Sequence, residues 1–371
     1  MIIARAPLRI SFCGGGTDLE AYYSRFGGLV VSAAISRYCY VIAHEQPDGT
    51  VTVNSADYHD WVEFPSTTAV SVEPPLALPR AALSWFIEQG LLRGGINLFL
   101  AAEVPPGSGL GSSSAMTVAL VTTLNAYTGH TMSAVEVAEL ACHLEIERLG
   151  MPIGKQDQYA SACGGLNTLT FTSDEVQVNP LKLSARTIAA LNERLLLFAT
   201  GQTRSSADIL GPQQANMKKR TQAHTPLHRM KELAMEIGQA LQEESLDRFA
   251  YLLDVGWQEK KRLSQHISSQ AIDQWYATAR EAGALGGKIT GAGGGGFMLL
   301  YCPPERQSAL RAALTQFGLH ELPFQLDWQG PQISTPAWSA PQRDTPLMAV
   351  DQMVYKHHQN KARYRRAKRL A

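Results

Sequence analysis

A glycine- and serine-rich stretch, VPPGSGLGSSSAMTVAL at residues 104–120, stands directly before an apolar run that predicts a helix. Glycine loses more backbone freedom on folding than any other residue, so three glycines here indicate that the chain needs bare backbone. Amides that lead into a helix N-terminus favour a phosphate group, because they are unpaired and the helix dipole attracts negative charge. A P-loop is excluded because the stretch has no Lys, and a nucleophile elbow because position 106 is Pro. The alternative is that Ser112, Ser113 and Ser114 only cap the helix.

A second glycine cluster, GGKITGAGGGGFMLLY at residues 286–301, matches the dinucleotide-binding fingerprint literally through Gly291, Gly293 and Gly296. That fingerprint requires a strand before it and a helix after it. Here we expect a helix first and a strand, residues 297–301, afterwards. The reversed order argues against a nicotinamide or flavin enzyme and favours a close-packed loop that crosses near a ligand.

The elements that must position these loops change character along the chain. Short β-rich runs and Gly-rich turns dominate the first half, and helices are expected at residues 113–129 and 133–150, the second opened by a capping box of Ser133 and Glu136. Beyond about residue 180, amphipathic patterns predict helices at 225–244, 245–264, 268–284 and 305–318. The pattern predicts an α+β protein of two lobes, with domains at 1–180 and 181–340 and a basic tail at 341–371 that is either a solvated arm or a docking segment.

Composition excludes several classes of protein. The chain has 371 residues and is 45% hydrophobic, with Lys plus Arg and Asp plus Glu at 33 each, so no global field draws in nucleic acid or an anionic membrane. No run approaches the roughly 20 apolar residues of a membrane span, and the N-terminus lacks the order of a signal peptide, which predicts a cytoplasmic protein. The five cysteines are scattered and indicate neither a disulfide framework nor a zinc site: Cys13, Cys39, Cys142, Cys163 and Cys302.

Three stretches carry a resemblance to a known family. APLRISFCGGGTD (6–18), VPPGSGLGSSSA (104–115) and KITGAGGGGF (288–297) resemble, in order and spacing, the three motifs of the GHMP kinases. GKQDQYASACGG, TGQTRSSADIL and LLDVGWQEKKRLS resemble the D-glycero-D-manno-heptose 7-phosphate kinase branch, and the resemblance covers roughly residues 2–320. It implies the two-lobed GHMP kinase fold, with a mixed β-sheet in the N-terminal lobe and a helix-rich α/β C-terminal lobe. It also implies ATP and magnesium (Mg²⁺) as cofactors.

The resemblance assigns the triphosphate cradle and two magnesium ligands, a serine and a glutamate. The cradle is Pro106, Gly107, Ser108, Gly109, Leu110, Gly111, Ser112, Ser113 and Ser114. Magnesium prefers hard oxygen ligands, which the family takes from a motif serine, best matched by Ser113, and from a helical Glu. Helical phase places Glu145 on an otherwise apolar face and Glu147 on a polar one. A metal ion would compensate the inward charge of Glu145, and a buried salt bridge is the alternative.

The remaining family roles concern the acceptor. Asp157 matches the catalytic aspartate, which would orient the acceptor hydroxyl and take its proton, although Asp157 could instead cap the short helix that follows. Arg9 matches an arginine beside that aspartate and would keep it ionised, and Arg204 is a second candidate.

Sugar selection is expected to fall to the first motif. Galactokinases have Glu and His where this chain has Gly15 and Gly16, which argues against galactose. A capping box of Thr17 and Glu20 would open a helix whose N-terminus binds an anion. A substrate that already carries phosphate fits this change. The predicted substrate-binding residues are Gly14, Gly15, Gly16, Thr17, Asp18, Lys155, Thr203, Arg204, Gly293 and Gly294.

The resemblance therefore implies an ATP-dependent kinase that phosphorylates the anomeric hydroxyl of D-glycero-D-manno-heptose 7-phosphate, for nucleotide-activated heptose and surface polysaccharide biosynthesis. The expected partner is a small sugar phosphate rather than nucleic acid or a membrane, and a homo-oligomer is left open. Two alternatives stand beside it: an L-fucose kinase-like sugar 1-kinase, and a sensor that binds sugar phosphate without turnover.

Overall fold

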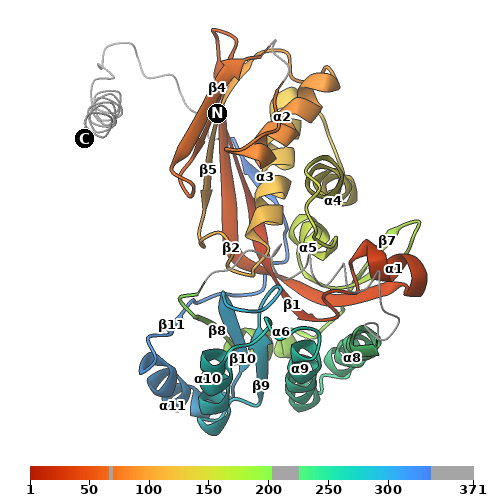
Figure 1. The fold of residues 1–371 in the computed structure, drawn as a ribbon, viewed down its shortest axis with the longest axis vertical. Helices are drawn as coiled ribbons and strands as arrows, with labels where there is room; N and C mark the ends of the chain where they lie inside the picture. Colours follow the sequence, from red (N-terminus) through yellow and green to blue (C-terminus); the bar gives the residue numbers. More distant parts are fainter. Residues whose placement is uncertain (67–69, 203–224, 336–371) are drawn as a thin grey trace. The chain divides into compact units, whose positions relative to one another are not determined.

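Two β-sheets organise the computed structural model, which describes residues 1–66, 70–202 and 225–335 (Figure 1). Residues 1–334 form one compact unit. The first sheet has the order β12-β1-β2-β5-β3-β4, with β6 paired to β2 and β7 to β6. Its strands are β1 Ile2–Cys13, β2 Gly28–Gln46, β3 Thr50–Ser55, β4 Asp60–Pro65, β5 Gly95–Ala102, β6 Leu166–Phe171, β7 Val176–Pro180 and β12 Gln332–Ser334. Because β3 runs parallel to β5 and the other pairs are antiparallel, the sheet is mixed, as expected.

The second sheet is antiparallel, in the order β11-β8-β10-β9. Its strands are β8 Leu195–Ala199, β9 Gly286–Ile289, β10 Phe297–Tyr301 and β11 His320–Glu321. Alternate residues of β8 point into two different apolar clusters, Leu197 into one and Phe198 into the other. Both faces of this sheet are therefore buried, which explains why β8 and β10 read as continuous apolar runs without alternation.

Helices cover both sheets. Along the first sheet lie α2 Ala77–Glu88, α3 Ser112–Thr128, α4 Ala134–Cys142 and α5 Gln156–Cys163, whose apolar side chains form one cluster with β2, β3 and β5 (Figure 1). The remaining helices are α1 Glu20–Phe26, α6 Ala185–Arg194, α8 Thr225–Gln242, α9 Leu246–Lys261, α10 Gln270–Glu281 and α11 Pro304–Thr315. Helices α8 and α9 contribute to a second cluster that reaches from β1 to β10.

Several predicted elements need correction. The glycine cluster after residue 290 joins strand β9 to strand β10, so a strand precedes it, where we expected a helix. The element directly after the cluster is strand β10 and not a helix, so the dinucleotide fingerprint still fails. The helix expected at 133–150 keeps its capping box but changes at His143 into a π-helical segment, η1 His143–Arg148. The pattern did not reveal α2, α6, β4, β6, β7 or β8.

The domain boundary at residue 180 stays a prediction, and the basic tail lies outside the described residues. All five cysteines are free. None of the helices in the described ranges is long and apolar enough to span a membrane.

Candidate active site

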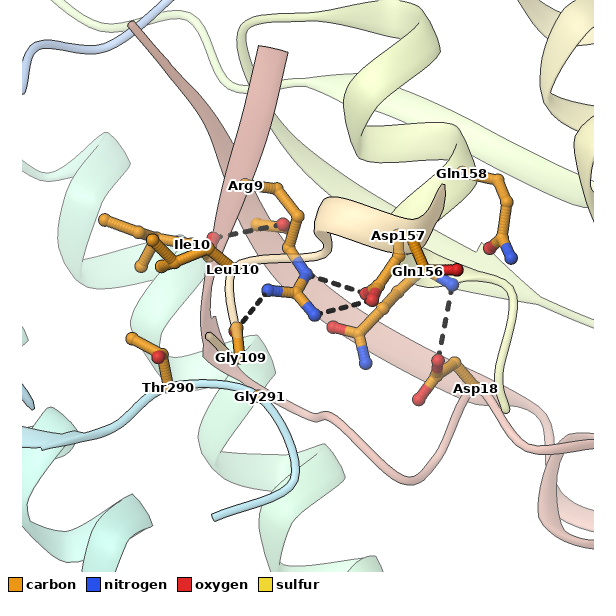
Figure 2. Close-up of polar contacts among 12 residues, drawn as sticks. Arg9, Ile10, Asp18, Gly109, Leu110, Gln156, Asp157, Gln158, Thr290 and Gly291 are labelled. Carbon is orange, nitrogen blue, oxygen red and sulfur yellow. Dashed lines mark hydrogen bonds and ion pairs between the residues drawn. The ribbon is translucent and has the colours of Figure 1, made fainter. Parts of the chain in front are cut away.

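The three glycine-rich motifs meet around one cavity of about 530 Å³. It is lined by residues from the end of β1 and the loop after it, from the loop before α3, from the start of α5, from α9 and from the loop after β9. The second and third motifs touch through their backbones: a Cβ on Gly291 would lie 2.6 Å from the Cα of Gly109 (Figure 2). Only glycine allows this approach, which explains the cluster in the third motif.

The phosphate loop enters helix α3 without a side-chain cap. Gly107, Gly109 and Gly111 all have left-handed backbone, with φ of 76°, 75° and 75°. Gly111 is the N-cap residue and no side chain caps the helix, so the interpretation of Ser112, Ser113 and Ser114 as capping residues is wrong. The serines instead form the first turn, where backbone amides have no intrahelical partner. Ser108 and Leu110 do not line the cavity, whereas Pro106, the three glycines and the three helical serines do.

Arg9 and Asp157 form a bidentate ion pair beside this loop (Figure 2). Arg9 Nε donates to Asp157 Oδ1 at 2.7 Å and Nη2 donates to Oδ2 at 2.6 Å, while Nη1 donates to the carbonyl of Gly109 at 2.7 Å. Helix α5 begins at Gln156 with Lys155 as its N-cap, so Asp157 does not cap it and that alternative is wrong. Arg9 therefore fixes the aspartate and the phosphate loop relative to each other.

Glu145 lies in the π-helical segment η1 and is fully buried. Its Oε1 accepts a hydrogen bond from Ser113 Oγ at 2.8 Å, and its Oε2 accepts one from Gln158 Nε2 at 2.6 Å. Burial raises the pKa of this carboxyl, and no ion pair joins it to a cation within the described ranges. Glu147 is mostly exposed and pairs with His143 at 2.8 Å. Glu145 therefore points into the protein and Glu147 toward solvent, as the helical phase predicts.

This pair of oxygen ligands fits magnesium. Mg²⁺ is usually bound by one or two protein oxygens together with waters and substrate phosphates, so Ser113 and Glu145 suffice without a cluster of carboxylates. The described part of the chain holds no group of three or more His, Cys, Asp or Glu residues suited to a metal. Burial away from water raises the pKa of the Glu145 carboxyl. A divalent cation beside it would stabilise the charged form and so compensate for that burial.

The first motif lines the cavity only in part. Gly15, Gly16 and Asp18 face it, whereas Gly14 and Thr17 do not. Thr17 Oγ1 donates to the carbonyl of Gly14 at 2.7 Å. Helix α1 starts at Glu20 with no side-chain cap, so the predicted capping box of Thr17 and Glu20 is wrong.

Asp18 is the acidic residue of this loop. Its Oδ1 accepts a hydrogen bond from the amide of Gly16 at 2.8 Å and its Oδ2 one from the amide of Gln156 at 3.3 Å. Burial, followed by the charge of Asp157, raises the pKa of its carboxyl. Two carboxyl groups from different motifs therefore face the same cavity.

Three other predicted substrate residues that the structure describes do not line the cavity. Lys155 Nζ lies over the ring of Tyr23, 5.3 Å from its centroid. Gly293 and Gly294 pack against Ile267, whose carbonyl accepts from the amide of Gly294 at 2.8 Å. Thr203 and Arg204 lie outside the described residues.

The sequence analysis missed two buried lysines that line the cavity, Lys260 of α9 and Lys288 of β9. Lys288 Nζ donates to the carbonyls of Ser11 and Phe12 at 2.7 and 3.0 Å, and burial lowers its pKa to about 8. Both lysines lie in motif stretches, and Lys260 follows Leu253 and Trp257 on the buried face of its helix. The helical phase that singled out Glu145 would have found Lys260 as well.

A second cavity, of about 440 Å³, adjoins the first and has a mainly apolar lining. The two share Pro106, Gly107, Ser112 and Ser113 of the phosphate loop, together with Tyr58 and Met151. The phosphate loop therefore lies between this apolar cavity and the first one, which we call the polar cavity because charged side chains line it.

Comparison with known proteins identifies the family. The model of the GHMP kinases N terminal domain matches residues 77–165, and the GHMP kinases C terminal model matches residues 238–320. A D-glycero-alpha-D-manno-heptose 7-phosphate kinase of Campylobacter jejuni is 30% identical over 315 residues, which cover 84% of this chain and 93% of the relative. This chain belongs to the GHMP kinase family. It is a kinase, a phosphotransferase, as the sequence predicts.

Solved structures of GHMP kinases share the fold. The crystal structure of a D-glycero-D-manno-heptose 1-phosphate kinase from Bacteroides thetaiotaomicron aligns with a TM-score of 0.77 at 28% identity, over 90% of this chain and 99% of that one. An L-fucokinase/L-fucose-1-P guanylyltransferase of Bacteroides fragilis is 27% identical over 350 residues, which cover 85% of this chain but 36% of that bifunctional protein. The α+β GHMP kinase fold is confirmed.

Proposed function

We propose that this GHMP kinase transfers the γ-phosphoryl group of ATP to the anomeric hydroxyl of D-glycero-D-manno-heptose 7-phosphate, giving the heptose 1,7-bisphosphate for nucleotide-activated heptose and surface polysaccharide biosynthesis. One observation carries the reaction type: Arg9 holds Asp157 and the phosphate loop together at one cavity. This arrangement suits phosphoryl transfer, whose main demands are in-line positioning and charge neutralisation.

In this proposal the two cavities bind different parts of the substrates. The apolar cavity suits the nucleoside of ATP, and the phosphate loop leads from it into the polar cavity. Ser113 and Glu145 would hold Mg²⁺, which when bound neutralises charge on the phosphates. A cytoplasmic location, where ATP is available, is part of the same proposal.

The acceptor sugar lies, in this proposal, against the first motif and α5. Asp157 takes the proton of the attacking hydroxyl, and Arg9 holds the carboxylate in place at the cavity through two hydrogen bonds. Asp18 accepts hydrogen bonds from other hydroxyls of the sugar. Ser11 Oγ and Gln156 Oε1 are buried at the same wall and have no hydrogen-bond partner in the described structure, so both are available to a polyhydroxylated ligand.

A substrate panel tests the proposal. ADP formation is measured with heptose 7-phosphate, the unphosphorylated heptose, heptose 1-phosphate and L-fucose, because named relatives include a 7-phosphate kinase, a 1-phosphate kinase and a fucokinase. We expect kcat/KM to be highest for the 7-phosphate. Equal turnover of the free heptose would refute the proposed substrate, a preference for L-fucose would support the fucokinase alternative, and binding without ADP formation would support a sensor.

A further inference from the structure

Lys260 is a buried cation to which the mechanism above gives no role. Its side chain is only 6% exposed, lines the polar cavity and donates a hydrogen bond to the carbonyl of Gly291. The other buried lysine, Lys288, is bound by two carbonyls, whereas Lys260 has this one. An ammonium group has three donors, so Lys260 keeps donors for a ligand in the cavity.

The charges around Lys260 favour an anion. The titratable groups that face it are Lys288 of β9, Arg9 and Cys13 of β1, and Asp18 of the loop after β1. None of the ion pairs within the described ranges includes Lys260. Burial, then the charges of Lys288 and Arg9, lower its pKa well below the ordinary value. Three cationic side chains (Arg9, Lys260 and Lys288) and two carboxyl groups (Asp18 and Asp157) line the cavity, which leaves one positive charge in excess for a phosphate group to neutralise.

The backbone contact between two motifs places this charge at the phosphate loop. Gly291, which accepts from Lys260, packs directly against Gly109, and Gly109 accepts from Arg9. Figure 2 shows Gly291 and Arg9 on opposite sides of Gly109. Lys260 therefore binds the third motif, and Arg9 binds the phosphate loop, at the point where the backbones of these two motifs touch.

We propose that Lys260 is a second cation, beside Arg9, that contacts the phosphoryl group while it passes from the nucleotide to the acceptor. This rests on the proposed function only in that the reaction is phosphoryl transfer. The bond from the acceptor oxygen to the γ-phosphorus forms, the bond to the β,γ-bridging oxygen breaks, and the acceptor proton goes to Asp157. Lys260 gives up no proton and neutralises charge on the moving group.

A kinetic comparison tests the role. Lys260→Met keeps the length of the side chain and removes the charge, and we expect kcat to fall by about 10²-fold or more with KM for the sugar phosphate little changed. The matched control is Lys261→Met, because Lys261 is the next residue of the same helix, is partly exposed and pairs with Asp273 at the surface. A rise in KM for the sugar phosphate with unchanged kcat would overturn the proposal, because Lys260 would then hold the acceptor's own phosphate.

Proton uptake gives a second readout that needs no acceptor sugar. Anion binding should raise the lowered pKa of Lys260, so a non-hydrolysable ATP analogue with magnesium should be bound with more proton uptake than ADP with magnesium. Calorimetry in buffers of different ionisation enthalpy at pH 7–9 measures this difference. We expect it in the wild type and in Lys261→Met, and we expect its loss in Lys260→Met and in Lys260→Arg, whose charge is permanent.

The two proposals fail in different ways. Lack of turnover with every sugar would refute the proposed substrate, but it would not change the proton uptake expected on binding of the ATP analogue. An undiminished proton uptake in folded Lys260→Met would refute the proposed role of Lys260 and would not affect the proposed substrate.

Discussion

Replacement of Glu145 by Gln should have opposite effects on stability and on catalysis. The buried carboxylate accepts from Ser113 and Gln158, and its raised pKa shows that burial of the charge costs free energy when no cation is near. Gln removes that cost and keeps the shape. Gln158 can rotate its amide to accept from the new side chain, since its Oε1 has no partner in the described structure.

The sizes of the two effects separate the hypotheses. A metal site predicts that the free energy of unfolding of the metal-free protein at pH 7.5 stays unchanged or rises, because the buried charge is gone. A buried salt bridge would instead predict a loss of about 3–5 kcal/mol, which is typical when one partner is removed. Loss of the metal ligand should weaken transition-state stabilisation by about 3–4 kcal/mol, or 10²- to 10³-fold in kcat.

Urea denaturation without metal and a magnesium titration of ADP formation measure both effects. The matched control is Glu147→Gln, two residues along, where the side chain is 69% exposed and pairs only with His143. We expect this control to stay within about 0.5 kcal/mol of the wild type and to keep its magnesium dependence. An unchanged magnesium titration in Glu145→Gln, or a larger defect in the control, would refute the assignment.

Three further perturbations test other parts of the site. Asp157→Asn breaks the bidentate pair with Arg9, so the free energy of unfolding, measured in urea, should fall by about 1–3 kcal/mol. Because Asn cannot take a proton, kcat should fall by about 10²-fold or more. Near-normal turnover would show that Asp157 is not catalytic. Gly15→Asp should raise KM for the sugar phosphate and leave KM for ATP unchanged, with Gly15→Asn as the neutral control, because a Cβ there would lie 3.2 Å from Gln156 Nε2 and 3.6 Å from Ser11 Oγ, both side-chain atoms. Equal KM values in both variants would exclude this loop from phosphate binding. Lys288 has a pKa of about 8 in the folded protein, below the ordinary 10.5, so the unfolded state binds more protons between pH 8 and 10.5. The free energy of unfolding should therefore rise by about 3 kcal/mol across that range. Urea denaturation should not find this rise in Lys288→Met.

Helical phase was the most informative part of the sequence for the site. It placed Glu145 inward and Glu147 outward because a charge among apolar residues at helical spacing must be buried with its neighbours. The same argument did not predict the π-helical segment, in which the amide of Leu149 donates to the carbonyl of Leu144 five residues earlier. Such a bond depends on how the helix meets its surroundings, so single-sequence periodicity does not reveal it.

Local cap signals failed where tertiary contacts competed for the same atoms. Thr17 has the spacing of a capping residue, yet its hydroxyl is held by Gly14 and accepts from the amide of Leu29 at 3.0 Å, at the start of β2. The serines in the first turn of α3 fail as caps because Gly111 already takes the N-cap position with a left-handed backbone. The hydroxyl of Thr17 is bound by backbone groups of Gly14 and Leu29, and that of Ser113 donates to Glu145 at 2.8 Å, so neither is used to cap a helix.

The backbone contact between Gly109 and Gly291 has a consequence for how the enzyme loses activity. Gly109 precedes a helix of the first sheet, whereas Gly291 lies between two strands of the second, so the catalytic chamber exists only while both sheets are folded and docked. Partial opening of either half would abolish catalysis before the chain loses most of its secondary structure. Enzymatic activity should therefore act as a sensitive reporter of sub-global unfolding, and neither half expressed as a separate fragment should retain turnover.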